Sequence, residues 1–217
     1  MHSKSELLEN CKLYLVLDSQ ILGYEALLKT AEEAIASGVD IIQLRDKTAS
    51  AGNMIQVAQQ IARLAKGKIP FIVNDRVDVA LAVGADGVHL GQEDLPLRQA
   101  RQMMGEEAII GISCQTLEHA QQAQQEGADY IGFGSVYKTK TKPVRRPMEL
   151  KLLKDVVEKI QIPVFAIGGI DHENIPPLIR LGIERVAVTR SILMVADVRQ
   201  ATRKLKEAVT EKALKRE

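Results

Sequence analysis

The segment QLRDK places Gln43, Arg45 and Lys47 at alternate positions of the chain. Residues two apart in an extended segment point to the same side, so an amide, a guanidinium and an ammonium group face one point. Arg offers a planar fork of donors and Lys a mobile point charge, a combination that suits a phosphate or pyrophosphate. These residues predict an anion site, although a surface ion pair between Arg45 and Asp46 explains the segment equally well.

Two carboxylates follow successive apolar runs, since Asp75 ends FIVND and Asp94 ends GVHLGQED. Taken singly, each stands where a helix N-cap is expected, and Pro96 follows Asp94 by two residues. If the two runs are neighbouring parallel strands, however, both acids lie on one rim beside the cations. Such a pair repels itself unless a cation lies between, and Mg²⁺ takes one or two protein carboxylates together with phosphate oxygens. We therefore expect Asp75 and Asp94 to bind a magnesium ion shared with a substrate pyrophosphate.

A long hydroxyl-rich and basic segment, GSVYKTKTKPVRRP, holds Thr139, Thr141 and Lys142. All three are natural phosphate partners, while a solvated basic loop is the plain alternative for each. The segment is long enough to act as a lid.

Two later segments are typical of phosphate-binding loops. AIGGI (166 to 170) and VAVTRSI (186 to 192) each join an apolar run to a helix start, where backbone N–H groups can bind an anion. The glycine pair also suits a tight turn. Ser113, in GISCQT, either donates to a departing phosphate or satisfies the turn before a helix that Thr116 caps.

Eight apolar or β-branched runs must position these residues, and helix-length amphipathic segments separate them, as in strands buried on both faces. The expected strands cover 12–17, 39–44, 70–74, 87–90, 108–112, 130–134, 163–167 and 185–188. The expected helices cover 23–37, 51–66, 76–83, 96–104, 117–126, 149–160, 172–181 and 191–209. Glycine ends several helices, in ASGVD, AVGADG, QEGADY and RLGIER.

This alternation predicts the α/β class and a single-domain (β/α)₈ TIM barrel over residues 1–217, with 1–11 as an N-terminal extension and 210–217 as a C-terminal tail. A doubly wound sheet is the alternative, but the segment after the first strand, DSQILG, lacks the Gly-rich fingerprint of that fold.

The composition excludes several classes of function. Lys plus Arg number 29 and Asp plus Glu 28, so no bulk field favours nucleic acid or an anionic membrane. The two cysteines form no CxxC pair, and the four histidines show no ligand spacing. The polar N-terminus and the lack of an apolar run of about 20 residues predict a soluble cytoplasmic protein. We expect small phosphorylated molecules as its partners, without nucleic acid or membrane, and the sequence leaves a homo-oligomer open.

The motifs QLRDK, VNDR, GVHLGQED, GISCQT, KTKTK and AIGGI occur in this order, and through them the chain resembles the thiamine-phosphate synthases over about residues 12 to 209. The resemblance implies a TIM-barrel transferase that joins hydroxymethylpyrimidine pyrophosphate to thiazole phosphate and releases pyrophosphate with the help of Mg²⁺. A dissociative route is expected, because the electron-rich aminopyrimidine shares the cationic charge while the cation cluster stabilises the leaving group.

The resemblance also implies a role for each motif residue. The pyrimidine pyrophosphate would be held by Gln43, Arg45, Lys47, Asn74, Ser113 and Lys142, and the metal by Asp75 and Asp94. Catalysis would involve Arg45, Lys47, Ser113 and Lys142, with Ser113 assisting the departing pyrophosphate. The thiazole phosphate would be received by Thr139, Thr141, Gly169, Thr189 and Arg190.

Departures from the family pattern keep two alternatives open. Arg190 stands where the family carries a small Ser, Ser135 and Lys138 stand where prolines are common, and Gln115 replaces a His. A thiazole tautomerase on the same barrel would need a positioned acid or base such as that His, which Gln115 cannot supply. A non-catalytic barrel that binds phosphate ligands is the second alternative, suggested by Arg190 and the altered sixth loop.

Overall fold

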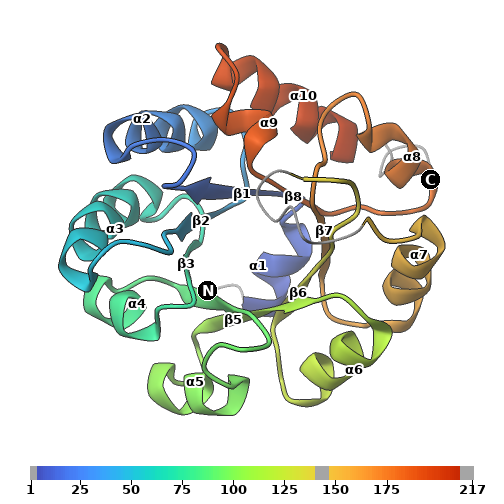
Figure 1. Cartoon of the computed structure of the whole chain (residues 1–217), viewed down its shortest axis with the longest axis horizontal. Coiled ribbons are helices and arrows are strands. Elements are labelled where there is room, and N and C mark those ends of the chain that lie inside the picture. Colours follow the sequence, from blue (N-terminus) through green and yellow to red (C-terminus); the bar gives the residue numbers. More distant parts are fainter. Residues whose placement is uncertain (1–3, 140–146, 211–217) are drawn as a thin grey trace.

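The chain forms a closed barrel of eight parallel strands in a computed structural model that describes residues 4–139 and 147–210. Each strand pairs with the next in chain order, and β8 closes the barrel against β1 (Figure 1). The strands are β1 (Leu13–Asp18), β2 (Ile41–Arg45), β3 (Phe71–Asn74), β4 (Gly87–Leu90), β5 (Ile109–Cys114), β6 (Tyr130–Phe133), β7 (Val164–Ile167) and β8 (Val186–Val188). The predicted single-domain (β/α)₈ barrel is therefore confirmed.

Helices surround the strands on the outside of the barrel (Figure 1). They are α2 (Tyr24–Ile35), α3 (Ala51–Ala65), α4 (Val77–Val83), α5 (Leu97–Met104), α6 (Leu117–Gln125), α7 (Leu150–Lys159), α8 (Ile175–Arg180), α9 (Arg190–Leu193) and α10 (Val198–Thr210). The helix-ending glycines of the four recurring phrases all adopt positive φ, at Gly38, Gly84, Gly127 and Gly182. Thr116 caps α6 as predicted, since its hydroxyl accepts from the His119 N–H.

The last predicted helix, 191–209, is wrong as one element. The chain leaves α9 after Leu193, and Asp197 starts a new helix because its carboxylate accepts from the Gln200 N–H at 2.8 Å. The short α9 thus follows β8 directly, at the end of the barrel where the strands finish.

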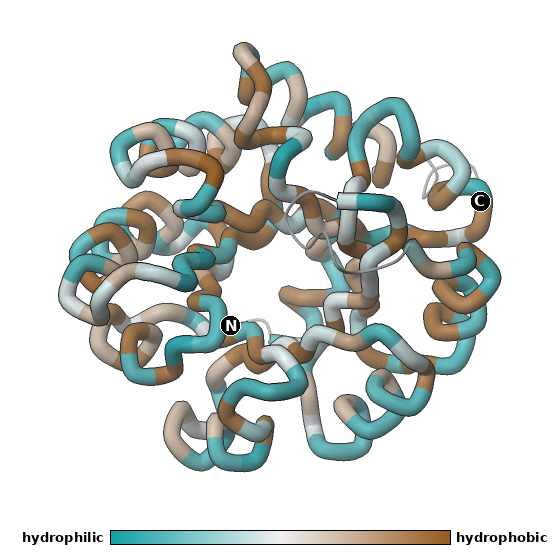
Figure 2. Tube along the Cα trace, in the orientation of Figure 1, coloured by the Kyte–Doolittle hydropathy of each residue, from teal (hydrophilic) through white to brown (hydrophobic). Residues whose placement is uncertain are grey.

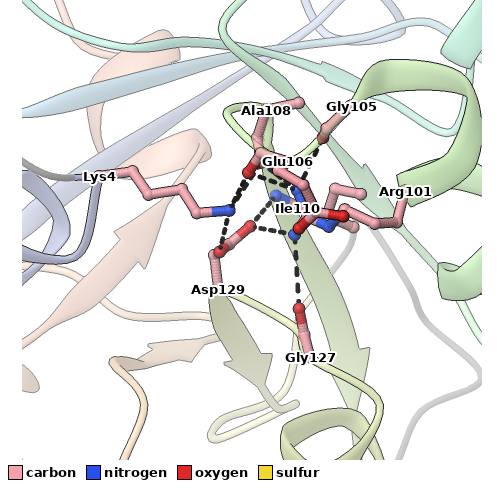
Figure 3. A network of polar contacts seen from close by, with 8 residues as sticks. All are labelled: Lys4, Arg101, Gly105, Glu106, Ala108, Ile110, Gly127 and Asp129. Carbon is pink, nitrogen blue, oxygen red and sulfur yellow. Dashed lines mark hydrogen bonds and ion pairs between the residues drawn. The ribbon is translucent and has the colours of Figure 1, made fainter.

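A first helix, α1 (Lys4–Asn10), lies within the segment that the sequence analysis left as an extension. It crosses the end of the barrel at which the strands begin, and its Leu8 is buried in the interior cluster beside Tyr14 and Ile41. Lys4 of this helix contacts the backbone of Glu106 and the carboxylate of Asp129 (Figure 3). The helix therefore closes the base of the barrel.

The core has two parts. A large cluster fills the space between strands and helices, and a smaller one fills the barrel interior with side chains such as Ile72, Phe165 and Ala187. Apolar residues follow the strands and the inner faces of the helices, while polar residues lie on the outer faces (Figure 2). Within residues 4–139 and 147–210, the structure contains no helix with the length and apolarity needed to cross a bilayer.

Candidate active site

A cavity of about 470 Å³ opens at the end of the barrel where the strands finish. This is the end that carries the chemistry in barrels of this type. Eight of the residues predicted for the site line it: Gln43, Arg45, Asn74, Ser113, Thr139, Gly169, Thr189 and Arg190. Thr141 and Lys142 lie outside the described residues, so their predicted roles stay predictions.

Strand alternation positions the first part of the cavity. Ile41 lies in the interior cluster, so Gln43 and Arg45, two and four residues further along β2, point to the same side. Arg45 Nη1 lies 2.7 Å from Asp18 Oδ2, and Asp18 is 1% exposed. The alternative ion pair of Arg45 with Asp46 is wrong, because Asp46 instead accepts from the Thr48 and Ala49 amides. The buried Asp18 holds the Arg45 guanidinium at the cavity wall.

Lys47, Asp75 and Asp94 meet on the rim just outside the cavity lining. The Lys47 ammonium pairs with Asp75, and the carboxyl groups of Asp75 and Asp94 contact each other. Burial, followed by the contact with Asp94, raises the pKa of Asp75 above its ordinary value, and Lys47 opposes that rise. The two carboxylates therefore lie together on one rim beside a cation, as predicted.

Neither carboxylate caps the helix that follows it, so the capping alternative is wrong. The N-cap position of α4 is Arg76 and that of α5 is Pro96, with no side-chain capping bond at either. Asp94 Oδ2 accepts instead from the Gly91 N–H at 2.7 Å. Asp75 adopts a left-handed backbone with φ of 60°, a conformation that is uncommon outside Gly and that Asp and Asn tolerate best.

The other side of the cavity is built by the turns after β7 and β8. Gly168 and Gly169 have φ of 111° and 66°, which lets the backbone approach the cavity closely. A Cβ at Gly169 would lie 2.6 Å from the Lys138 carbonyl oxygen, so the turn also packs against the sixth loop. The Arg190 side chain lines the same wall, with Nη1 at 2.6 Å from the Met194 sulfur.

Three buried polar atoms on the cavity lining have no hydrogen-bond partner among the residues that the structure describes. They are Asn74 Nδ2, Arg190 Nε and Ser191 Oγ. A buried polar group without a partner is costly, at about 1–3 kcal/mol each, and is normally satisfied. Their position predicts that a polar ligand completes them, with Asn74 on one side and Arg190 with Ser191 on the other.

Several lining residues were missed by sequence reasoning. His89 on β4 lies opposite Ser113, with Nε2 at 2.9 Å from Oγ, and Tyr14 and Phe165 form the floor, with the buried Tyr130 packed against both. The signal was available, since His89 is the next-to-last residue of an apolar strand beside Asn74, with which it pairs in register. Asp18, at the end of β1, could have been found in the same way.

The two carboxylates suit the predicted Mg²⁺, but they are too few to fill its coordination shell by themselves. In the parts of the chain that the structure describes, no group of three or more His, Cys, Asp or Glu could hold a metal ion. An ion bound by Asp75 and Asp94 would therefore take its other ligands from substrate or water, which is the habit of Mg²⁺.

Comparison with known proteins gives a consistent result. Residues 13–192 match the family model of thiamine monophosphate synthase. The thiamine-phosphate synthase of Ruminiclostridium cellulolyticum is 42% identical over 202 residues, covering 93% of this chain and 96% of the relative. That of Alkaliphilus oremlandii is 43% identical over 198 residues, covering 91% and 95%.

Solved structures agree. Thiamine phosphate pyrophosphorylase from Pyrococcus furiosus superposes with a TM-score of 0.85 at 38% identity, covering 94% of this chain and 98% of its own. A 3-hexulose-6-phosphate synthase, with a TM-score of 0.71 at 21% identity, shares the fold alone.

Proposed function

The chain belongs to the thiamine monophosphate synthase family of transferases, and we propose that it joins hydroxymethylpyrimidine pyrophosphate to thiazole phosphate in the cavity described above. The observation that carries the proposal is the convergence of donors from successive strands. Gln43 and Arg45 on β2, Asn74 on β3 and Ser113 on β5 face one cavity, and Lys47 lies on its rim beside Asp75 and Asp94.

The reaction asks the protein to stabilise a leaving group. Breaking the C–O bond to pyrophosphate builds negative charge on the departing oxygens, and preorganised donors lower that barrier electrostatically. Arg45, held by Asp18, and Lys47 bind these oxygens, and the Ser113 hydroxyl donates a hydrogen bond to them. The Gln43 and Asn74 amides orient the aminopyrimidine, whose ring shares the positive charge as the bond breaks.

Asp75 and Asp94 would hold the Mg²⁺, which would supply positive charge to the pyrophosphate leaving group. The Lys47 ammonium pairs with Asp75, which supports a site that attracts positive charge. Thiazole phosphate would bind at the opposite wall, where Thr139, Gly169, Thr189 and Arg190 lie. Its ring nitrogen would form the new C–N bond to the carbon whose C–O bond to pyrophosphate breaks, and no enzyme nucleophile is needed.

Pyrophosphate release from the two substrates, with and without Mg²⁺, tests this proposal. We expect release only when both substrates and the metal are present. Binding of either phosphate compound without any release would support the non-catalytic barrel instead. Rearrangement of a thiazole carboxylate phosphate without the pyrimidine would support the tautomerase.

A further inference from the structure

Five side chains form one hydrogen-bonded chain at the floor of the cavity, four of them on its lining and Tyr130 buried beneath it. Gln43 Nε2 donates to the Tyr14 hydroxyl, which lies 2.9 Å from the Tyr130 hydroxyl. The Tyr130 hydroxyl lies 3.1 Å from His89 Nδ1, and His89 Nε2 lies 2.9 Å from Ser113 Oγ. This hydrogen-bonded chain thus begins at Gln43 and ends at Ser113, both of which we assign to substrate binding. The three residues between them have no such assignment.

The barrel is shaped to hold the middle of this chain. A Cβ at Gly111 would lie 2.0 Å from the Tyr130 ring, and one at Gly132 would lie 3.2 Å from the His89 ring. Both glycines are on strands, β5 and β6, so their missing side chains leave the space that the two rings fill. The His89 and Tyr130 rings stack with centroids 5.5 Å apart, and Phe165 packs edge-on against Tyr130. The positions of the rings are therefore fixed by packing.

The direction of the chain depends on which atoms donate. An amide nitrogen only donates, so the Tyr14 oxygen accepts from Gln43, while either oxygen can donate between Tyr14 and Tyr130. If each group passes its own proton to the next, Tyr14 donates to Tyr130, Tyr130 donates to His89 Nδ1, and the imidazole proton lies on Nε2, facing Ser113. Burial raises the pKa of both tyrosines, so each keeps its proton.

We propose that this chain is a positioning device, which fixes His89 as its Nε2–H tautomer and leaves the Ser113 hydroxyl proton for an anion in the cavity. In the opposite direction the Ser113 proton would point at His89, and the oxygen lone pairs would face the anion. The inference rests on the proposed function for the identity of that anion, the departing pyrophosphate. It adds His89, Tyr130 and Tyr14 as residues that act through Ser113.

The tautomer is measured directly by ¹⁵N NMR of the imidazole in the substrate-free protein, at about pH 8, where an ordinary His is neutral. We expect the Nε2–H form, and the Nδ1–H form would overturn the proposal. This measurement needs no turnover, so it stands apart from the proposed function. In Gln43→Glu the acid accepts from Tyr14, so we expect the Nδ1–H share to rise; an unchanged ratio would show that residue 43 does not set the direction.

A double-mutant cycle tests whether the chain acts through Ser113. Tyr130→Phe keeps the ring and removes the hydroxyl, and we expect it to lower kcat about 10-fold with little change in KM. In a Ser113→Ala background the same change should leave kcat unaltered. An equal loss in both backgrounds would mean that Tyr130 acts by packing alone, and the proposal would fail. Thr202→Val, which removes a buried hydroxyl from α10, is the matched control and should leave kcat unchanged.

Discussion

The two ends of the barrel differ in how their carboxylates are paired. At the base, Asp129 lies between two cations, with Lys4 Nζ at 2.9 Å and Arg101 Nη2 at 2.6 Å, and it also accepts from the Ile110 N–H (Figure 3). At the mouth, the carboxyl groups of Asp75 and Asp94 contact each other beside Lys47, and three buried polar atoms lack partners among the described residues.

The difference separates charges that hold the fold from charges that hold a ligand. The acid at the base is balanced within the protein, and the two cations also donate to backbone carbonyls such as that of Ala108. Among the described residues, the mouth instead carries a pair of carboxyl groups in contact and three buried polar atoms without partners, groups that a bound cation and a bound anion would satisfy. Substitutions at the base should therefore change stability, and those at the mouth should change turnover.

The largest expected effect is at the mouth carboxylates. Asp75→Asn and Asp94→Asn should each lower Mg²⁺-dependent turnover by about 100-fold or more, because an amide is a poor magnesium ligand. Their melting temperatures should change by no more than about 2 °C. The raised pKa of Asp75 means that its ionised form is disfavoured by the fold at neutral pH, so removing the charge does not weaken the fold. Asn also tolerates the left-handed backbone at residue 75.

Steady-state kinetics and thermal unfolding of the same preparations check this prediction. Equal losses of turnover and stability would assign the carboxylates to the fold, and the comparison between the two ends would fail.

The next effect is at the base. Arg101→Met leaves Asp129 with one cation in place of two, and we expect it to lower the free energy of unfolding by about 2–3 kcal/mol, with kcat unchanged. Lys154→Met, in an exposed pair on α7, is the control and should change stability by less than about 0.5 kcal/mol. Urea unfolding measures both. If Arg101→Met lowers kcat under conditions in which the variant is fully folded, the base of the barrel is not purely structural.

The smallest expected effect is the pH dependence of metal binding at the rim. Because the pKa of Asp75 is raised, its carboxyl group takes up a proton at a higher pH than an ordinary Asp, and protonation competes with the metal. Titration calorimetry with Mg²⁺ should show the affinity falling as the pH is lowered, and the fall should begin at a higher pH than an ordinary Asp would give.

Lys47 lowers the pKa of Asp75, so Lys47→Met should move the loss of affinity to higher pH. Identical profiles for the two proteins would show that the ammonium does not control the carboxylate pair.

Much of the fold was predictable because strands buried on both faces and helices ended by Gly leave strong local patterns. Gln43, Arg45, Asp75 and Asp94 could be placed at one end of the barrel from the same patterns, since parallel strands deliver their ends to one side. Their convergence needed no knowledge of distances.

What could not be predicted depends on contacts between residues far apart in sequence. The pairing of Arg45 with Asp18 comes from the register of β1 against β2, and the link of His89 to Ser113 comes from that of β4 against β5. The break between α9 and α10 was also missed, although Asp197 gives a local capping signal. The helix α1 was missed because its seven residues carry little apolar periodicity, and its place is set by the barrel that it closes.

That closing helix also constrains how the chain reaches its final form. Lys4 meets Glu106, 102 residues later, so α1 depends on a distant part of the chain for its partners. Until β5 and β6 have been synthesised, Leu8 has no complete interior to enter, and contacts of such long range form slowly. We therefore expect α1 to dock late in folding, after β5 and β6 have formed.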